Sequence, residues 1–525
     1  MEHLDKKTKI TIMIAVMSAL LFSALNMTIV GTSLPKIIAS IGGMDYYSWV
    51  FTVYMLTASI TSILVGKLSD IYGRKVFILI GIAVFMVGGL LSGFSQTIIQ
   101  LIIFRGIQGF GGGMIMSSAF TTIGDLFSPR ERGRWQGLMG AVFGLSSLFG
   151  PTLGGFIVDN MDWSWVFWIF LPIGFFAFFM IYKLYPQAER REKEKIDFLG
   201  SFVLSITILS LLLGFSLAGN DYSWGSFQVI GLFAIFFGSL ILFIIIENRV
   251  ESPVVPLGLF KNSIVSVSNI ASFLSGAGMF GVIMYVPFYI QGVLGRSATL
   301  SGLTEMAMTT SMVMISAVAG QLITKTGKYK LMGLVGFATL SLGLFLNSLL
   351  TPESSLLTMV FNLVICGIGL GLTMPIFTLT VQNAVEHKYL GVATATSQLS
   401  RQMGGTVGVA ILGATLNSRM SAELERAKLP PELVNGSLEG ASDLQNPSLL
   451  MDPHAIEAIQ SQLPEQMQPM FEQLLLVLQN ALNASLTGVF FFASMTVALA
   501  FIVTLFLKEI PLRESNEPTI VKEQE

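Results

Sequence analysis

Apolar stretches of about twenty residues alternate with short polar connections along the whole chain. A helix needs about 20 apolar residues to cross the hydrocarbon core of a bilayer, so each stretch predicts one membrane-spanning helix. The first stretch is too long for the apolar part of a secretion signal and lacks a clear cleavage site, so we interpret it as a retained span. The fourteen predicted spans are 11–33, 46–66, 76–95, 98–122, 135–157, 163–183, 198–218, 228–246, 264–290, 301–323, 331–350, 355–380, 391–415 and 485–507.

Composition supports an all-α membrane protein. Charged residues make up 12% of the chain and apolar residues 53%, whereas about a quarter of a soluble protein is charged. The mean hydropathy is +0.72. A single cysteine, Cys366, excludes an intramolecular disulfide, and the net charge of −2 gives no reason to expect a nucleic-acid partner.

The basic residues predict the orientation of the chain. If the N-terminus is cytoplasmic, 23 of the 30 Lys and Arg residues fall in inner segments and five in outer segments. The remaining two, Arg105 and Arg401, lie inside predicted spans. Because cytoplasmic loops of membrane proteins are enriched in Lys and Arg, we expect both termini to be cytoplasmic.

A degenerate repeat divides the chain into two like halves. The stretch 66–75 (GKLSDIYGRK) reappears 254 residues later as 320–329 (GQLITKTGKY), and the same offset maps Gly137 onto Gly391 and Gly150 onto Gly404. Two like halves with a site between them are typical of secondary transporters. We therefore expect a half at 1–183, a linker with two inserted spans at 184–247, a second half at 248–415, an outer loop at 416–484, and a last span with a tail at 485–525.

The range 416–484 is the longest polar stretch. It carries nine acidic against three basic residues, and the pattern from His454 to Leu482 predicts short amphipathic helices. Two interpretations remain open. The loop is either a cap on the outer mouth or an acidic antechamber that concentrates cationic solutes or protons.

The stretch 66–75 resembles the loop 2–3 signature of the major facilitator superfamily. Gly66 and Gly73 allow a tight turn and close helix approach. Asp70 lies at the end of a span, where it can pair with a basic residue or with a helix N-terminus across an inner gate, to which we also assign Arg74. The resemblance implies that such a pair forms when the inner side is closed.

Span five resembles the antiporter signature of drug exporters in the same superfamily. Small residues let helices pack closely and proline kinks a helix, so the signature predicts a tight seam that stops leakage. The alternative is a structural helix pair with no further role. The residues concerned are Gly137, Gly150, Pro151, Gly154 and Gly155.

Three further stretches, 105–109, 163–172 and 25–35, resemble motifs of spans four, six and one in the fourteen-span drug:proton antiporter family, and the chain as a whole resembles the Bacillus-type multidrug exporters of that family. The resemblance implies two six-helix halves plus two inserted central helices. One residue departs from it: Asn26 stands where span one normally has an aspartate. Asparagine cannot titrate, so only a hydrogen-bonding role in the substrate cavity remains for Asn26.

Charges inside spans are costly and mark functional sites. Three are predicted, Arg105, Glu305 and Arg401, and Glu305 is the one carboxylate among them. We predict that Glu305 carries the coupling proton, that Arg105 biases its protonation, and that Met308, Met312 and Arg401 line a compliant substrate cavity. The alternatives are that Glu305 lies wet near the outer end of its span, and that Arg105 is a structural hydrogen-bond hub.

These patterns predict a proton-coupled exporter of hydrophobic and cationic compounds, monomeric, in a bacterial plasma membrane. The chain has no P-loop motif for ATP hydrolysis and no cluster that suggests a catalytic or metal site, so we expect neither an enzyme nor a cofactor. The rivals are a dedicated exporter of one metabolite, lipid or siderophore, and a non-transporting membrane sensor.

Overall fold

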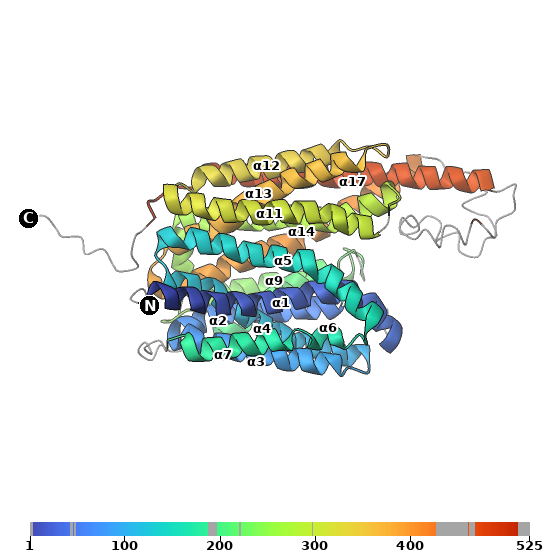
Figure 1. Cartoon of the computed structure of the whole chain (residues 1–525). Helices are drawn as coiled ribbons and strands as arrows, with labels where there is room; N and C mark the ends of the chain where they lie inside the picture. Colours follow the sequence, from blue (N-terminus) through green and yellow to red (C-terminus); the bar gives the residue numbers. More distant parts are fainter. Residues whose placement is uncertain are drawn as a thin grey trace, which may run out of the picture.

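The computed structural model describes residues 4–42, 49–186, 197–219, 222–296, 298–426 and 468–512, together with Tyr46 and Gln460. Within these ranges the protein is helical and has no strand beyond one isolated bridge between Ala218 and Tyr222. Long helices run roughly side by side along one direction (Figure 1).

The first six predicted spans form one group of helices, in the lower half of Figure 1. Two short connections shape this group. Gly73 adopts φ 90°, which L-residues with a side chain rarely adopt, and so allows the sharp turn from α2 into α3. Pro129 occupies the first turn of α5, where its missing N–H is not needed. The helices are α1 (Lys6–Ile41), α2 (Trp49–Tyr72), α3 (Arg74–Gly93), α4 (Ile98–Leu126), α5 (Pro129–Asn160), α6 (Trp165–Trp168) and α7 (Leu171–Leu184), of which α6 and α7 together make one span.

The second group lies in the upper half of Figure 1 and has its own apolar core, which includes Phe337, Phe377 and Phe490. Its helices are α10 (Ser263–Phe288), α11 (Ala298–Thr326), α12 (Lys330–Ser348), α13 (Leu356–Ala384), α14 (Leu390–Arg426) and α17 (Gln468–Leu505). Helix α10 continues into a π-helical turn, Tyr289–Val293. The two groups meet where α5 packs against α11 and α2 against α14.

Two helices, α8 (Phe198–Leu217) and α9 (Phe227–Glu247), pack against each other, and α8 also packs against α2 of the first group and α14 of the second. Val203 and Ile208 of α8 share an apolar cluster with Ile63 of α2 and Val392 of α14. Helix α9 is strongly apolar yet largely exposed: 11% of the residues in its most apolar 18-residue stretch are buried. An exposed apolar surface of this kind faces lipid in a membrane protein.

The expected fold class is confirmed among the described residues. Thirteen helices are long and apolar enough to cross a membrane. Helix α14 is also long enough but more polar, and it is the candidate for the fourteenth span. The polar character of α14 comes from residues such as Gln398, which is buried, and Arg401 and Gln402, which are half-buried.

The last two helices are longer than their apolar stretches. Helix α14 continues to Arg426 and α17 begins at Gln468, so both extend into the range expected to be a loop, and α17 projects beyond the other helices (Figure 1). Met420 and Leu474 are buried in this extension, which explains why the helices continue past the membrane-length stretch. Short amphipathic helices were expected over 454–482. Residues 454–467 lie outside the described residues apart from Gln460, whereas residues 468–482 form the first part of the single long helix α17.

Candidate functional site

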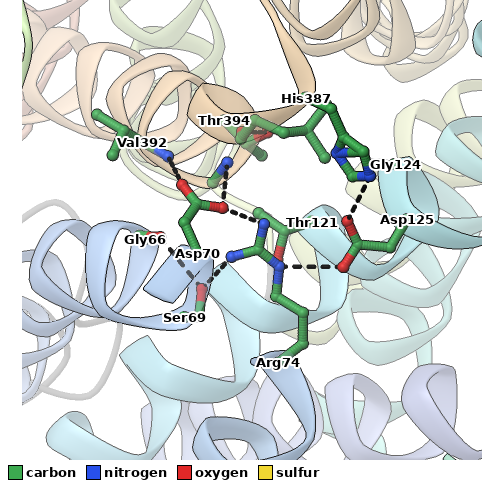
Figure 2. A network of polar contacts seen from close by, with 12 residues as sticks. Gly66, Ser69, Asp70, Arg74, Thr121, Gly124, Asp125, His387, Val392 and Thr394 are labelled. Atoms are coloured by element: carbon green, nitrogen blue, oxygen red, sulfur yellow. Dashed lines mark hydrogen bonds and ion pairs between the residues drawn. The ribbon is translucent and has the colours of Figure 1, made fainter. Parts of the chain in front are cut away.

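A buried ion-pair network lies where α2, α3, α4 and α14 meet (Figure 2). Arg74, the first residue of α3, is 4% exposed. Its guanidinium pairs with the Asp70 carboxylate and donates to the Ser69 hydroxyl and, through Nε at 3.2 Å, to Asp125 Oδ2. One arginine thus bridges two carboxylates from different helices, the arrangement in which a planar five-donor cation is most effective.

Asp70 also joins the two groups of helices. Its Oδ1 accepts from the Gly391 N–H at 3.1 Å and its Oδ2 from the Val392 N–H at 3.3 Å, both in the first turn of α14. These N–H groups have no partner within the helix, and the positive end of the helix dipole attracts a carboxylate there. Asp70 was expected to pair with a basic residue or with a helix N-terminus, and in this conformation it does both, with Arg74 as the basic residue.

The small size of Gly66 permits that contact. A Cβ on Gly66 would lie 2.7 Å from the Cβ of Ala395 and 3.0 Å from the Gly391 carbonyl oxygen, so α2 could not approach α14 as closely.

Two further residues lie close to Asp125. His387 precedes α14, and its Nε2 lies 3.7 Å from Asp125 Oδ1. No pattern in the sequence predicts this contact. Burial and the nearby Asp125 charge raise the pKa of Tyr185, which stays neutral beside Thr122.

The repeated stretch makes a weaker version of the same contact. Thr324 stands 254 residues after Asp70. Its hydroxyl accepts from the Arg134 N–H of α5 at 3.2 Å, and its carbonyl accepts from Arg130 Nε at 3.2 Å. Each half therefore contacts the start of a helix in the other, but the second contact contains no carboxylate. We call the region around Asp70, Arg74 and Asp125 the Asp70 end.

The span-five glycines do not form one seam. A Cβ on Gly137 would lie 2.4 Å from the Ser316 carbonyl oxygen of α11, whereas one on Gly150 would lie 1.9 Å from the Thr28 hydroxyl of α1. The Gly154 carbonyl accepts from the Ser33 hydroxyl of α1 at 3.3 Å. A Cβ on Gly155 would meet nothing within 4 Å. Pro151 belongs to the same helix. The seam between the two groups thus contains Gly137, while Gly150 and Gly154 pack within the first group.

Arg105 lies at the centre of a second polar cluster, between α1, α2 and α4. It is 0% exposed, and its Nη1 donates to Asn26 Oδ1 at 2.9 Å and to Gln108 Oε1 at 2.6 Å. Its guanidinium lies 4.3 Å from the centroid of the Tyr54 ring, within the range of a cation–π contact. Asn26 and Arg105 are therefore in direct contact, although they were predicted for different roles.

The predicted residues of the second group are less closely connected. Arg401 donates to the Gln398 side chain and, at 3.2 Å, to Met374 Sδ. Glu305 lies in the second turn of α11, and its Oε1 is buried with no hydrogen-bond partner among the described residues. In the described part of the chain, no hydrogen bond or ion pair joins Glu305 to Arg105 or Arg401. Met308 and Met312 are buried on the following turns.

The comparisons with known proteins agree with this architecture. Residues 16–409 match the family model for the Major Facilitator Superfamily. The chain is 38% identical over 525 residues to the multidrug transporter protein MdtP of Bacillus subtilis (98% of this chain, 95% of the relative) and 35% identical to multidrug resistance protein 3 of the same organism (97% of each).

Two solved structures share the fold at low sequence identity. The human organic anion transporter MFSD10 has a TM-score of 0.61 at 14% identity (93% of this chain, 99% of that chain), and the proton:xylose symporter XylE has 0.61 at 12% identity (96% and 97%). Transporters of this family handle small-molecule substrates. The match of the family model, the two helical halves and the Asp70 end together show that this chain is a multi-pass membrane transporter that belongs to the Major Facilitator Superfamily.

Proposed function

We propose that the chain is a proton-coupled exporter of hydrophobic compounds that works by alternating access, with both termini and the Asp70 end on the cytoplasmic side of a bacterial plasma membrane. The contact of Asp70 with the first turn of α14 carries the proposal. It ties one half to the other at one end of the molecule, as a closed gate requires, and it consists of hydrogen bonds and ion pairs that can break without disturbing either apolar core.

Export against a concentration gradient needs an energy source. The proton-motive force supplies about 2.3 kcal/mol per charge per 100 mV, plus the contribution of the pH gradient. Glu305 supports proton coupling because it is a carboxylate inside a span whose buried Oε1 lacks a partner among the described residues, and ionisable residues in spans commonly mark proton pathways. The two Bacillus relatives are named as multidrug proteins, which supports a hydrophobic substrate class.

The test is efflux from proteoliposomes with an imposed pH gradient. We expect Glu305→Gln to abolish gradient-driven accumulation and to leave downhill exchange of a hydrophobic dye measurable, because the motion of the halves does not need the charge. Glu423→Gln is the matched control, since Glu423 is a carboxylate on α14 that pairs with the exposed Arg426. Gradient-driven transport by Glu305→Gln at the wild-type rate would exclude Glu305 as the carrier.

A dedicated exporter of one metabolite, lipid or siderophore would use the same scaffold, because fold does not decide substrate. A panel of chemically diverse dyes in the same proteoliposomes distinguishes the two functions. We expect several unrelated dyes to be transported. Transport of a single compound would favour the dedicated exporter, and the absence of any transport would favour a sensor.

A further inference from the structure

The cluster around Arg105 has more hydrogen-bond donors than acceptors. Asn26 and Gln108 use their amide oxygens on the same guanidinium nitrogen, Arg105 Nη1. Four buried nitrogens are then left without a partner among the described residues: Arg105 Nε, Arg105 Nη2, Asn26 Nδ2 and Gln108 Nε2. All four are donors, so an acceptor is what would complete the cluster.

Arg105 also has no carboxylate partner in the described part of the chain. Among the described residues, Arg74, His387, Lys388 and Arg426 lie within ion-pair distance of a carboxylate, whereas Arg105 does not. Exposures of 0% for Arg105 and Gln108 and 1% for Asn26 keep bulk water away from the cluster in this conformation. A buried cation whose neighbours are two neutral amides and an aromatic ring attracts negative charge, because low-dielectric surroundings screen it little.

The cluster lies close to the boundary between the two halves. Tyr54, which stacks on Arg105, is followed by Met55, whose Sδ accepts from Gln402 Nε2 of α14 at 3.5 Å. A rearrangement that separates α2 from α14 would therefore uncover the side of α2 next to the cluster. The other arginine inside a span, Arg401 of the second half, is likewise paired with an amide and a thioether and not with a carboxylate among the described residues.

We propose that Arg105, Asn26 and Gln108 form the recognition site for an anionic group, a carboxylate or its equivalent, carried by a hydrophobic substrate. The inference rests on the proposed transport function and narrows its substrate class. The family resemblance implies cationic substrates, for which an aspartate at position 26 would supply the counter-charge. With Asn26 in that place, the charge of the site has the opposite sign, and a substrate carboxylate takes the place that the aspartate would fill beside Arg105.

The test compares two water-soluble probes of equal size and opposite charge, 4-phenylbutyrate and 4-phenylbutylamine. Their binding to the purified full-length protein is measured by isothermal titration calorimetry near neutral pH, without any gradient. We expect the carboxylate to bind about tenfold or more tightly than the amine, as charge-assisted hydrogen bonds to a buried guanidinium imply. Equal affinities, or preference for the amine, would overturn the proposal.

Asn26→Asp should reverse the preference, because the new carboxylate occupies the unpartnered donors of Arg105. Gln108→Glu places a carboxylate in the same cluster from α4 and should act in the same direction, which keeps the test decisive if one variant fails to fold. Asn347→Asp is the matched control: Asn347 is a fully buried asparagine of α12, and a charge there should leave the probe preference unchanged. A preference that survives both Asn26→Asp and Gln108→Glu would show that Arg105 is not the ligand.

The outcome is separable from the proposed function. If gradient-driven efflux of neutral dyes occurs but the two probes bind equally, the proposed transport function is supported and the anion-recognition site is contradicted. If the carboxylate binds selectively and Asn26→Asp reverses the preference, but no pH gradient drives efflux, the anion-recognition site is supported and the proton-coupled function is contradicted.

Discussion

Arg74 and Arg105 are both buried arginines of the first half, yet their surroundings are opposite. Arg74 is 4% exposed and is held by Asp70 and Asp125, whereas Arg105 is 0% exposed and meets two amides and the Tyr54 ring. A cation with two carboxylates needs nothing further and stabilises the arrangement in which it is found. A cation without a carboxylate partner remains available to a bound ligand that carries negative charge. The first arrangement is suited to a gate and the second to a recognition site.

The largest effect on the stability of the closed state should come from replacing Arg74, the arginine at the Asp70 end. Arg74→Gln would leave two buried carboxylates without a cation, and breaking a buried pair from one side costs on the order of 3–5 kcal/mol. We expect the closed state to be lost first, because the Asp70 contact with α14 depends on that geometry. The measurement is the rate at which a thiol reagent labels Ala395→Cys. Labelling should be fast when Arg74→Gln is also present and slow when Arg74 is retained.

Arg74→Lys sharpens the same comparison. A lysine keeps the charge but cannot bridge two carboxylates in the bidentate manner of a guanidinium, so its effect should be intermediate. If Ala395→Cys is labelled as fast with Arg74→Lys as with Arg74→Gln, the geometry of the guanidinium is essential and its charge alone is insufficient. If Ala395→Cys is labelled as slowly with Arg74→Gln as with Arg74 retained, the ion-pair network does not keep the gate closed.

A smaller effect on stability and on proton leak is expected at Gly137, in the seam between the two halves. Gly137→Ala would place a Cβ 2.4 Å from a backbone oxygen of α11, so one helix must shift. Overpacking of this kind costs about 1–3 kcal/mol. Gly155→Ala is the matched control, because nothing lies within 4 Å of its new methyl group. Thermal unfolding in detergent and proton leak in substrate-free liposomes should change in the first variant and not in the second.

Equal behaviour of the two alanine variants would mean that the antiporter signature does not act through close packing. The comparison also separates the parts of that signature. Gly137 belongs to the contact between the halves, whereas Gly150 packs on Thr28 within the first half. A leak confined to the Gly137 variant would assign the barrier to the boundary between the halves.

The smallest effect should come from His387. Its Nε2 lies 3.7 Å from Asp125 Oδ1, and its side chain is 38% exposed. A partly exposed pair of this length contributes little, and the imidazole is charged only when protonated. We expect His387→Gln to change the transport rate less than about threefold. Transport rates of the variant and the unmodified protein in proteoliposomes check this, and a larger loss would show that the contact with Asp125 is essential to the gate.

Two members of the Asp70 end, Asp70 and Arg74, could be identified from the sequence, whereas Asp125 could not. The stretch 66–75 is local, so its glycines, Asp70 and Arg74 can be recognised in the chain. Asp125 and His387 come from segments about 50 and 310 residues away from Arg74 along the sequence, and no local pattern links them to it. The same limit separated Asn26 from Arg105 in the sequence, although their side chains touch.

The sequence by itself determined where the membrane-length apolar stretches lie and that the chain repeats itself, because these follow from the thickness of the bilayer and from patterns that are read along the chain. Only the tertiary structure decided which charges are paired and how far α14 and α17 continue past their apolar stretches. Helix packing brings Asp70 to α14 and Asn26 to Arg105, places Gly155 away from any seam, and leaves the buried oxygen of Glu305 without a partner among the described residues. Pairing depends on the rotation and approach of whole helices, and those are set by the close packing of many small and apolar residues at once.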